Sequence, residues 1–242
     1  MGYSEIPDAA NLREALERVR SRIAAAQARS PNAAEHITIV AVTKAFPVEA
    51  LMTGYQAGHR IFGESRVQEA AAKLPQFSQR DQCQVHFIGR LQSNKARQAL
   101  ELFDLIESVD SLKLLRRLDG IAGQLGKRVP VYLQVNAGGD PAKSGFDPHE
   151  LRREITAIAG VENLAVAGLM TIAPLTGDEQ RIRDCFSSVR RLREEISKEI
   201  PTCKDLSMGM SGDFELAVEE GATHVRLGSV LFGRRPGTGN QA

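Results

Sequence analysis

One lysine of this chain stands where an amine can become a nucleophile. Residues 37–43 (Ile-Thr-Ile-Val-Ala-Val-Thr) are apolar or β-branched and predict a strand buried on both faces, and Lys44 follows them directly. An amine at the end of a buried strand loses hydration, which lowers its pKa and makes the neutral form available. Such a lysine can form a Schiff base with a carbonyl compound. The alternative is a structural lysine whose aliphatic part is buried while its charge reaches water.

Two turns rich in glycine and hydroxyl groups occur near the end of the chain, at 207–212 (Ser-Met-Gly-Met-Ser-Gly) and 226–229 (Arg-Leu-Gly-Ser). Glycines allow backbone N–H groups to converge on a phosphate, and a serine hydroxyl adds a donor. The alternative is that both are tight turns that need glycine for their backbone alone. The candidate phosphate ligands in these turns are Ser211, Gly212, Gly228 and Ser229.

Arg226 begins the second of these turns and lies on a predicted strand, where a guanidinium needs a partner or a ligand. A ligand that carries both an aldehyde for Lys44 and a phosphate for the turns fits better than phosphate alone. Pyridoxal 5′-phosphate (PLP) meets that description, with Arg226 close to its pyridine nitrogen. A guanidinium cannot accept a proton and does not favour a protonated ring, so weak or selective chemistry is expected.

The elements that must position these residues alternate along the chain. An N-terminal helix is predicted from the apolar stripe of Leu12, Leu16, Val19, Ile23 and Ala26. Strands then alternate with helices, which indicates a single (β/α)₈ TIM barrel of class α/β with its functional groups at the C-terminal ends of the strands. A doubly wound sheet competes, but no Gly-x-Gly-x-x-Gly follows an early strand. The predicted strands are 37–43, 60–62, 84–88, 105–109, 129–135, 164–171, 205–208 and 224–227, with the last continuing towards Phe232.

The predicted helices between these strands are 47–55, 67–74, 93–102, 112–125, 147–159, about 182–200 and 213–220. We expect residues 1–242 to form one PLP-binding barrel domain, with residues 1–30 supplying the N-terminal helix and residues 234–242 forming a loose tail.

Composition excludes several classes of protein. With 31 Lys+Arg against 30 Asp+Glu, the formal net charge is +1, which does not favour a nucleic acid or an anionic membrane as the main partner. Apolar runs are too short for a membrane span, and no secretory signal is visible. The three cysteines are odd in number and widely spaced, so neither a disulfide framework nor a metal site follows. A cytoplasmic protein is expected.

These motifs together resemble the pyridoxal phosphate homeostasis protein family, and the resemblance extends from the first predicted strand to the last. It is carried by 40–44 (Val-Ala-Val-Thr-Lys), 62–69 (Phe-Gly-Glu-Ser-Arg-Val-Gln-Glu), 86–95 (His-Phe-Ile-Gly-Arg-Leu-Gln-Ser-Asn-Lys), 143–145 (Lys-Ser-Gly), 168–170 (Gly-Leu-Met), 206–211 (Leu-Ser-Met-Gly-Met-Ser) and 225–233 (Val-Arg-Leu-Gly-Ser-Val-Leu-Phe-Gly).

The resemblance implies an alanine-racemase-like barrel that lacks the racemases' β-domain and holds PLP as an internal aldimine on Lys44. It also implies that Ser211, Gly228 and Ser229 hold the phosphate and that Arg226 faces the ring nitrogen. The implied role is non-catalytic: a monomeric PLP carrier in vitamin B6 homeostasis, with PLP-dependent apo-enzymes as recipients. The family has asparagine where this chain has Ser65. The resemblance therefore implies a cofactor contact at Ser65 only through a hydroxyl that is shorter than the family's amide.

Two enzymatic readings remain open at this point. A PLP-dependent amino-acid racemase would need a second proton donor on the opposite face of the cofactor, and neither Tyr132 nor Cys83 is convincingly placed for it. A Schiff-base aldolase would use Lys44 without a cofactor. His86 is interpreted as a satisfied core or rim histidine, because no carboxylate near it in sequence would orient it. If Glu64 has no role in the site, we expect it to be a loop residue that pairs with Arg66 or Lys95.

Overall fold

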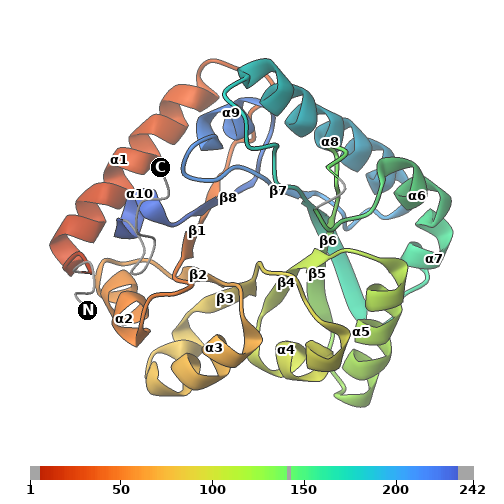
Figure 1. Ribbon diagram of the computed structural model, residues 1–242, viewed down its shortest axis with the longest axis horizontal. Helices are drawn as coiled ribbons and strands as arrows, with labels where there is room; N and C mark the ends of the chain where they lie inside the picture. Colours follow the sequence, from red (N-terminus) through yellow and green to blue (C-terminus); the bar gives the residue numbers. More distant parts are fainter. Residues whose placement is uncertain (1–5, 141–142, 234–242) are drawn as a thin grey trace.

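The structure is a computed structural model and describes residues 6–140 and 143–233. Its strands form one closed parallel barrel in chain order, surrounded by helices (Figure 1). The closing pair joins the first strand to the last, with Thr38 beside His224 and Ala41 beside Leu227. This pairing confirms the barrel and excludes an open sheet. The strands are β1 (Thr38–Val42), β2 (Ile61–Glu64), β3 (Gln84–Phe87), β4 (Leu105–Val109), β5 (Val129–Gln134), β6 (Leu164–Met170), β7 (Asp205–Ser207) and β8 (His224–Leu227).

The additional N-terminal helix is present as predicted. It begins after Asp8, whose carboxylate accepts a hydrogen bond from the Asn11 amide, and its apolar stripe is buried. The helices are α1 (Ala9–Gln27), α2 (Val48–Gln56), α3 (Val67–Lys73), α4 (Ala96–Leu102), α5 (Leu112–Gln124), α6 (Pro148–Arg153), α7 (Ile155–Ala159), α8 (Glu179–Glu199), α9 (Phe214–Glu219) and α10 (Ser229–Phe232).

The prediction was wrong where the chain leaves β8. The predicted strand was to continue towards Phe232, but Ser229–Phe232 forms the short helix α10, in which the Phe232 amide donates to the Gly228 carbonyl at 2.9 Å. A run of Val-Leu-Phe carries the same apolar signal in a strand and in a buried helical turn, so periodicity cannot separate them. Helix α10 therefore begins directly after Gly228, within the second of the two glycine-containing turns.

Smaller differences concern element ends. Strand β2 extends through Gly63 to Glu64, and the predicted helix 147–159 is divided at Glu154 into α6 and α7. The predicted helix 93–102 starts as the 3₁₀ turn η3 (Ser93–Lys95) before α4. The predicted loose tail, 234–242, lies outside the described residues.

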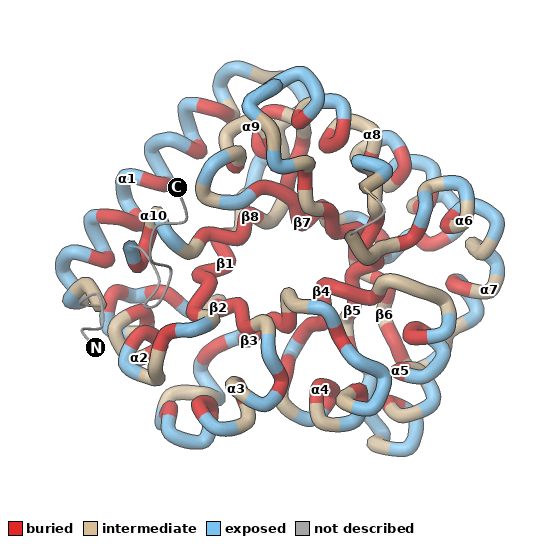
Figure 2. Tube along the Cα trace, viewed as in Figure 1, coloured by how far each residue is buried: buried red, intermediate tan, exposed pale blue. Residues whose placement is uncertain are grey.

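The strands of the barrel are buried, and some of their buried side chains are polar. Figure 2 shows the strands as an almost continuous buried ring with exposed helix faces outside it. Most buried side chains are apolar, but a group of polar side chains on or next to the strands is buried as well. Among the described residues, no helix is long and apolar enough to cross a membrane. The buried polar group includes Thr43, Glu64, His86, Glu107, Ser207 and Arg226.

Candidate functional site

Lys44 lies in the turn that leaves β1, and its immediate neighbour fixes that turn. Thr43 is fully buried, and its hydroxyl donates to Glu64 Oε1 at 2.7 Å. The Thr43 carbonyl accepts a hydrogen bond from Lys73 Nζ at 3.0 Å. Both polar groups of Thr43 are thus held by side chains from β2 and α3. Lys44 is half-buried at the C-terminal end of the barrel, as the sequence predicts.

The far side of the same turn is also anchored. Ala45 has φ +64°, an uncommon value for a residue with a Cβ, and its amide donates to Glu69 Oε1 at 2.7 Å. Lys73 joins the two anchors, because its Nζ lies 2.7 Å from Glu64 Oε1 and 3.2 Å from Glu69 Oε1. Glu64 therefore pairs with Lys73, which corrects the expected pairing with Arg66 or Lys95.

Burial opposes the charge on Glu64. Desolvation raises the pKa of this carboxyl, against the attraction of Lys73 and the hydrogen bonds from Lys73 and Thr43. One of its oxygens, Oε2, is buried without a hydrogen-bond partner. The turn before Lys44 is consequently held by a buried ion pair in which one carboxylate oxygen of Glu64 has no hydrogen-bond partner.

A cavity of about 300 Å³ opens beside Lys44. Its wall includes Gln134 and Asn136 after β5, and a second amine, Lys143, whose Nζ donates to the Ala173 carbonyl at 2.8 Å. Small-molecule sites begin at about 300 Å³ and combine apolar walls with a few polar groups. A compact aldehyde with one aromatic ring fits a cavity of this size, with Lys44 in its wall.

The two predicted phosphate turns lie together. Ser211 Oγ accepts a hydrogen bond from the Val230 amide at 3.4 Å, which joins the turn after β7 to the first turn of α10. A Cβ on Gly228 would lie 3.5 Å from the Val42 side chain and carbonyl oxygen, so the second turn adjoins the end of β1 that leads to Lys44. Ser229 is exposed at the start of α10, and Gly212 is exposed between β7 and α9.

Asp213 lies between the turn that carries Ser211 and helix α9. The structure places its carboxylate within its own loop, where Oδ1 accepts a hydrogen bond from the Met210 amide at 2.6 Å, and it makes no cap of α9. Burial raises the pKa of Asp213. This carboxylate stabilises the loop that carries Ser211.

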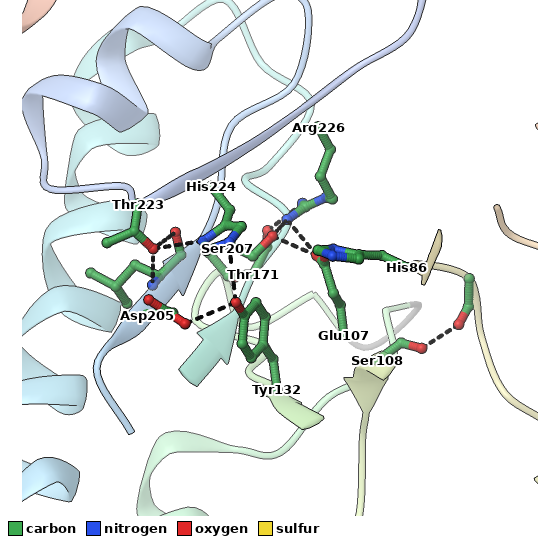
Figure 3. Close-up of polar contacts among 12 residues, drawn as sticks. His86, Glu107, Ser108, Tyr132, Thr171, Asp205, Ser207, Thr223, His224 and Arg226 are labelled. Carbon is green, nitrogen blue, oxygen red and sulfur yellow. Dashed lines mark hydrogen bonds and ion pairs between the residues drawn. The ribbon is translucent and has the colours of Figure 1, made fainter. Parts of the chain in front are cut away.

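Arg226 lies in the centre of the barrel and has protein partners (Figure 3). Its Nη1 donates to Ser207 Oγ at 2.7 Å and its Nη2 to the Thr171 carbonyl at 2.8 Å. Ser207 Oγ in turn donates to Glu107 Oε2 at 2.5 Å, and Glu107 lies 3.8 Å from Arg226. Burial lowers the pKa of Arg226, with Glu107 opposing that shift. The guanidinium is thereby fixed by strands β4, β6 and β7.

His86 is the second partner of Glu107. Its Nδ1 lies 2.8 Å from Glu107 Oε1, and both side chains are buried (Figure 3). Burial alone would raise the pKa of Glu107, but the hydrogen bond and charge of His86, together with Arg226, lower it. The interpretation of His86 as a satisfied core residue agrees with this geometry. Its orienting carboxylate was missed because it lies on the neighbouring strand rather than nearby in sequence.

Ser65 does not itself line the cavity beside Lys44. It follows β2, is half-buried, and lines a second recess on the outer side of the barrel end. Its carbonyl packs against Gly89, where an added Cβ would stand 2.1 Å from that oxygen. Ser65 is therefore positioned by close backbone packing of the loops after β2 and β3.

The groups that a racemase would need are placed elsewhere or engaged. Tyr132 is buried, and its hydroxyl donates to Asp205 Oδ2 at 3.0 Å and lies 3.3 Å from His224 Nε2. Cys83 precedes β3, at the opposite end of the barrel from Lys44. Among the described residues, no group of three His, Cys, Asp or Glu side chains is arranged to hold a metal ion.

Comparisons with known proteins agree with this architecture. Residues 15–236 match the family model for the alanine racemase N-terminal domain. A pyridoxal phosphate homeostasis protein from Vibrio cholerae is 35% identical over 228 residues, which cover 93% of this chain and 97% of that protein. The homologue of the same name from Synechocystis is 41% identical over 82% of this chain and 92% of that protein.

Solved structures give the same result. PipY of Synechococcus elongatus, solved without PLP, superposes with a TM-score of 0.83 at 41% identity, covering 92% of this chain and all of that chain. The structure of PipY with PLP bound has a TM-score of 0.81 at 39% identity. An alanine racemase from Clostridium difficile shares the fold alone, with a TM-score of 0.74, 18% identity and 59% of that chain covered. This chain belongs to the alanine racemase N-terminal domain family and, within it, to the pyridoxal phosphate homeostasis proteins.

Proposed function

We propose that this protein binds PLP through a Schiff base on Lys44 and serves in PLP homeostasis with little or no catalytic turnover. The observation that carries the proposal is the position of Lys44, which lines the cavity of about 300 Å³ in a turn clamped by Glu64, Lys73 and Glu69. In forming the Schiff base, the neutral amine of Lys44 adds to the aldehyde and one water leaves. When bound, PLP supplies the aldehyde and an electron-withdrawing ring.

The remaining roles follow from the chemistry of each group. Ser211, Gly212, Gly228 and Ser229 contribute hydroxyl and backbone N–H donors to the phosphate. Arg226 presents a permanent cation at the centre of the barrel, where it disfavours protonation of the ring nitrogen. Like the two phosphate turns and Arg226, Ser65 lies outside the lining of the cavity beside Lys44, and it is kept as a neighbouring loop residue that supports the site.

Low turnover is supported by the state of the other proton donors. Racemisation needs acid and base groups on opposite faces of the substrate carbon. The hydroxyl of Tyr132 is engaged with Asp205 and His224, and His86 is engaged with Glu107. The relatives carry the name of homeostasis proteins rather than of enzymes.

Three further features complete the proposal: a monomer, a cytoplasmic location and PLP-dependent apo-enzymes as recipients. The three cysteines, which are buried and free, support a reducing compartment. Light scattering coupled to size exclusion tests the monomer directly, since a dimer would double the measured mass.

The absorption spectrum tests the proposal as a whole. Purified protein mixed with PLP should give a yellow band that survives gel filtration and is lost in Lys44→Ala. The matched control is Lys204→Ala, an exposed lysine near the opposite end of the barrel, which should keep the band. A band that persists in Lys44→Ala, or amino-acid racemase activity that survives rigorous purification, would contradict the proposal.

A further inference from the structure

A second and larger recess lies beside the candidate PLP site. Its volume is about 680 Å³, and it lies between the ends of strands β2, β3 and β4 and the first turns of α3 and α5. Its wall carries four cationic side chains and a single carboxylate, Asp110. The four cations are Arg66, Arg90, Lys95 and Lys113.

These four cations share the wall of one recess, and none of them has an acidic partner among the described residues. Among residues 6–140 and 143–233, none of the four makes an ion pair or donates a side-chain hydrogen bond. Some arginines elsewhere are paired closely, as in Arg22 with Glu215 at 2.5 Å and Arg183 with Glu219 at 2.6 Å. With a net charge of only +1, the excess around this recess is a local feature. Four like charges gathered beside a single carboxylate repel one another, so a bound anion would stabilise them.

Neutral donors complete the wall. Gln68, Gln92 and Ser93 present amide or hydroxyl groups to the recess. Helix α5 starts there: Ser111 Oγ caps the Leu114 amide at 3.3 Å, which leaves the N–H groups of the two preceding residues without an intrahelical partner. The helix end adds to a set of side chains that already favours an anion.

We propose that this recess binds a small phosphorylated molecule, at a site separate from that of Lys44. Its volume lies within the range of about 300–1,000 Å³ that is typical of small-molecule sites. Two guanidinium groups and two ammonium groups suit a ligand with two or more negative charges, since guanidinium groups bind phosphate oxygens in pairs. A hollow with donors on several sides also fits a small anion better than the flat face of an acidic protein.

The two sites share one wall residue. Arg90 lines both the recess and the cavity beside Lys44, whereas Arg66 and Lys113 line only the recess. The last two therefore allow the recess to be tested without altering the candidate PLP site.

Calorimetric titration of inorganic pyrophosphate into PLP-loaded protein, freed of unbound PLP by gel filtration, tests the proposal, because bound PLP fills its own site and no free PLP competes for the recess. The variant Arg66→Gln/Lys113→Gln should bind pyrophosphate at least about tenfold more weakly, as expected for loss of two charge-assisted contacts. The control Arg128→Gln/Lys198→Gln removes the same charge from exposed positions outside the recess and should change affinity less than about twofold.

Three results would overturn the proposal: no binding of pyrophosphate, equal loss in the control variant, or equal binding of citrate, which would mean that the recess responds to charge alone. The recess does not depend on the proposed PLP function. If no yellow band forms but the Arg66/Lys113 variant still loses pyrophosphate, the PLP proposal fails and this one stands. If the yellow band forms and the Arg66/Lys113 variant binds pyrophosphate as tightly as the wild type, the PLP proposal stands and this one fails.

Discussion

Arg226 and Glu107 face each other in the centre of the barrel, 3.8 Å apart, and the Ser207 hydroxyl bridges them. Both side chains are almost completely buried, at 4% and 0% exposure. A buried guanidinium is tolerated only when an opposite charge and hydrogen bonds compensate its lost hydration. Glu107 supplies the charge, and Ser207 and the Thr171 carbonyl supply the hydrogen bonds.

Replacing Glu107 by Gln should therefore be costly. The change leaves Arg226 buried without its counter-charge, and we expect the free energy of unfolding in urea at pH 7 to fall by about 3–5 kcal/mol. The control is Glu195→Gln, which breaks the exposed ion pair with Arg152 and should cost less than about 1 kcal/mol. Equal losses of unfolding free energy in the two variants would mean that the buried charge of Glu107 stabilises the fold no more than the exposed charge of Glu195 does.

The buried pair below Lys44 should show coupling. Lys73→Met leaves Glu64 as an unpaired buried carboxylate, whereas adding Glu64→Gln removes that charge. The free energy lost by the double variant should thus be smaller than the sum of the single losses by about 1–3 kcal/mol. A double-mutant cycle measured by urea unfolding gives this number directly. Simple additivity would show that the 2.7 Å contact between Lys73 and Glu64 contributes nothing specific.

Much of this architecture could be predicted from the sequence, and the limit is physical. The β-branched runs, the Asp147-Pro148 helix start and the N-terminal stripe are local signals, and all three occur where expected. Pairings between elements are not local. Lys73 approaches Glu64 only after α3 packs beside β2, and Glu107 approaches His86 only because β3 and β4 are neighbours in the barrel. No short sequence pattern carries that information.

The recess could not be predicted from the sequence either. Arg66, Arg90, Lys95 and Lys113 come from three separate segments, after β2, after β3 and in the first turn of α5, and each alone looks like an exposed basic residue. Lys95 directly precedes α4 and is half-buried in the recess wall. Only the closed barrel brings the loops after β2, β3 and β4 together.

His59 should make stability depend on pH. It is buried, its Nε2 lies 2.8 Å from the Ile61 carbonyl, and desolvation lowers its pKa from 6.5 to about 4. Because the unfolded chain binds the proton more readily, stability is complete above pH 6.5 and is lost as the pH falls towards 4. Between pH 7 and pH 5 the wild type should lose roughly 2 kcal/mol more than His59→Gln, at about 1.4 kcal/mol per unit.

The measurement for His59 is urea unfolding at pH 7, 6 and 5. The exposed His36 provides the control, since His36→Gln should retain the wild-type slope. His224, whose pKa is also lowered by burial, contributes equally to all three proteins and leaves their difference unchanged. A His59→Gln protein with the wild-type slope would contradict the assignment.

Two glycine substitutions should have opposite effects. A Cβ on Gly89 would stand 2.1 Å from the Ser65 carbonyl oxygen, so Gly89→Ala must displace the backbone of the loop after β2. We expect a loss of roughly 1–3 kcal/mol in unfolding free energy. Gly120 lies on the exposed face of α5 with open space around it, and Gly120→Ala should gain roughly 0.5–1 kcal/mol. Thermal unfolding of both variants checks the prediction; a neutral Gly89→Ala would contradict the close packing of these loops.

The central claim is that Lys44, rather than any other amine near the barrel end, carries PLP. Reduction of the PLP-loaded protein with borohydride, followed by proteolysis and mass spectrometry, converts the Schiff base into a stable pyridoxyl-lysine that can be located. We predict the modification on the peptide containing Lys44, in near-stoichiometric amount. A modification found mainly on Lys143, Lys95 or Lys204, or no modified lysine at all, would contradict the account.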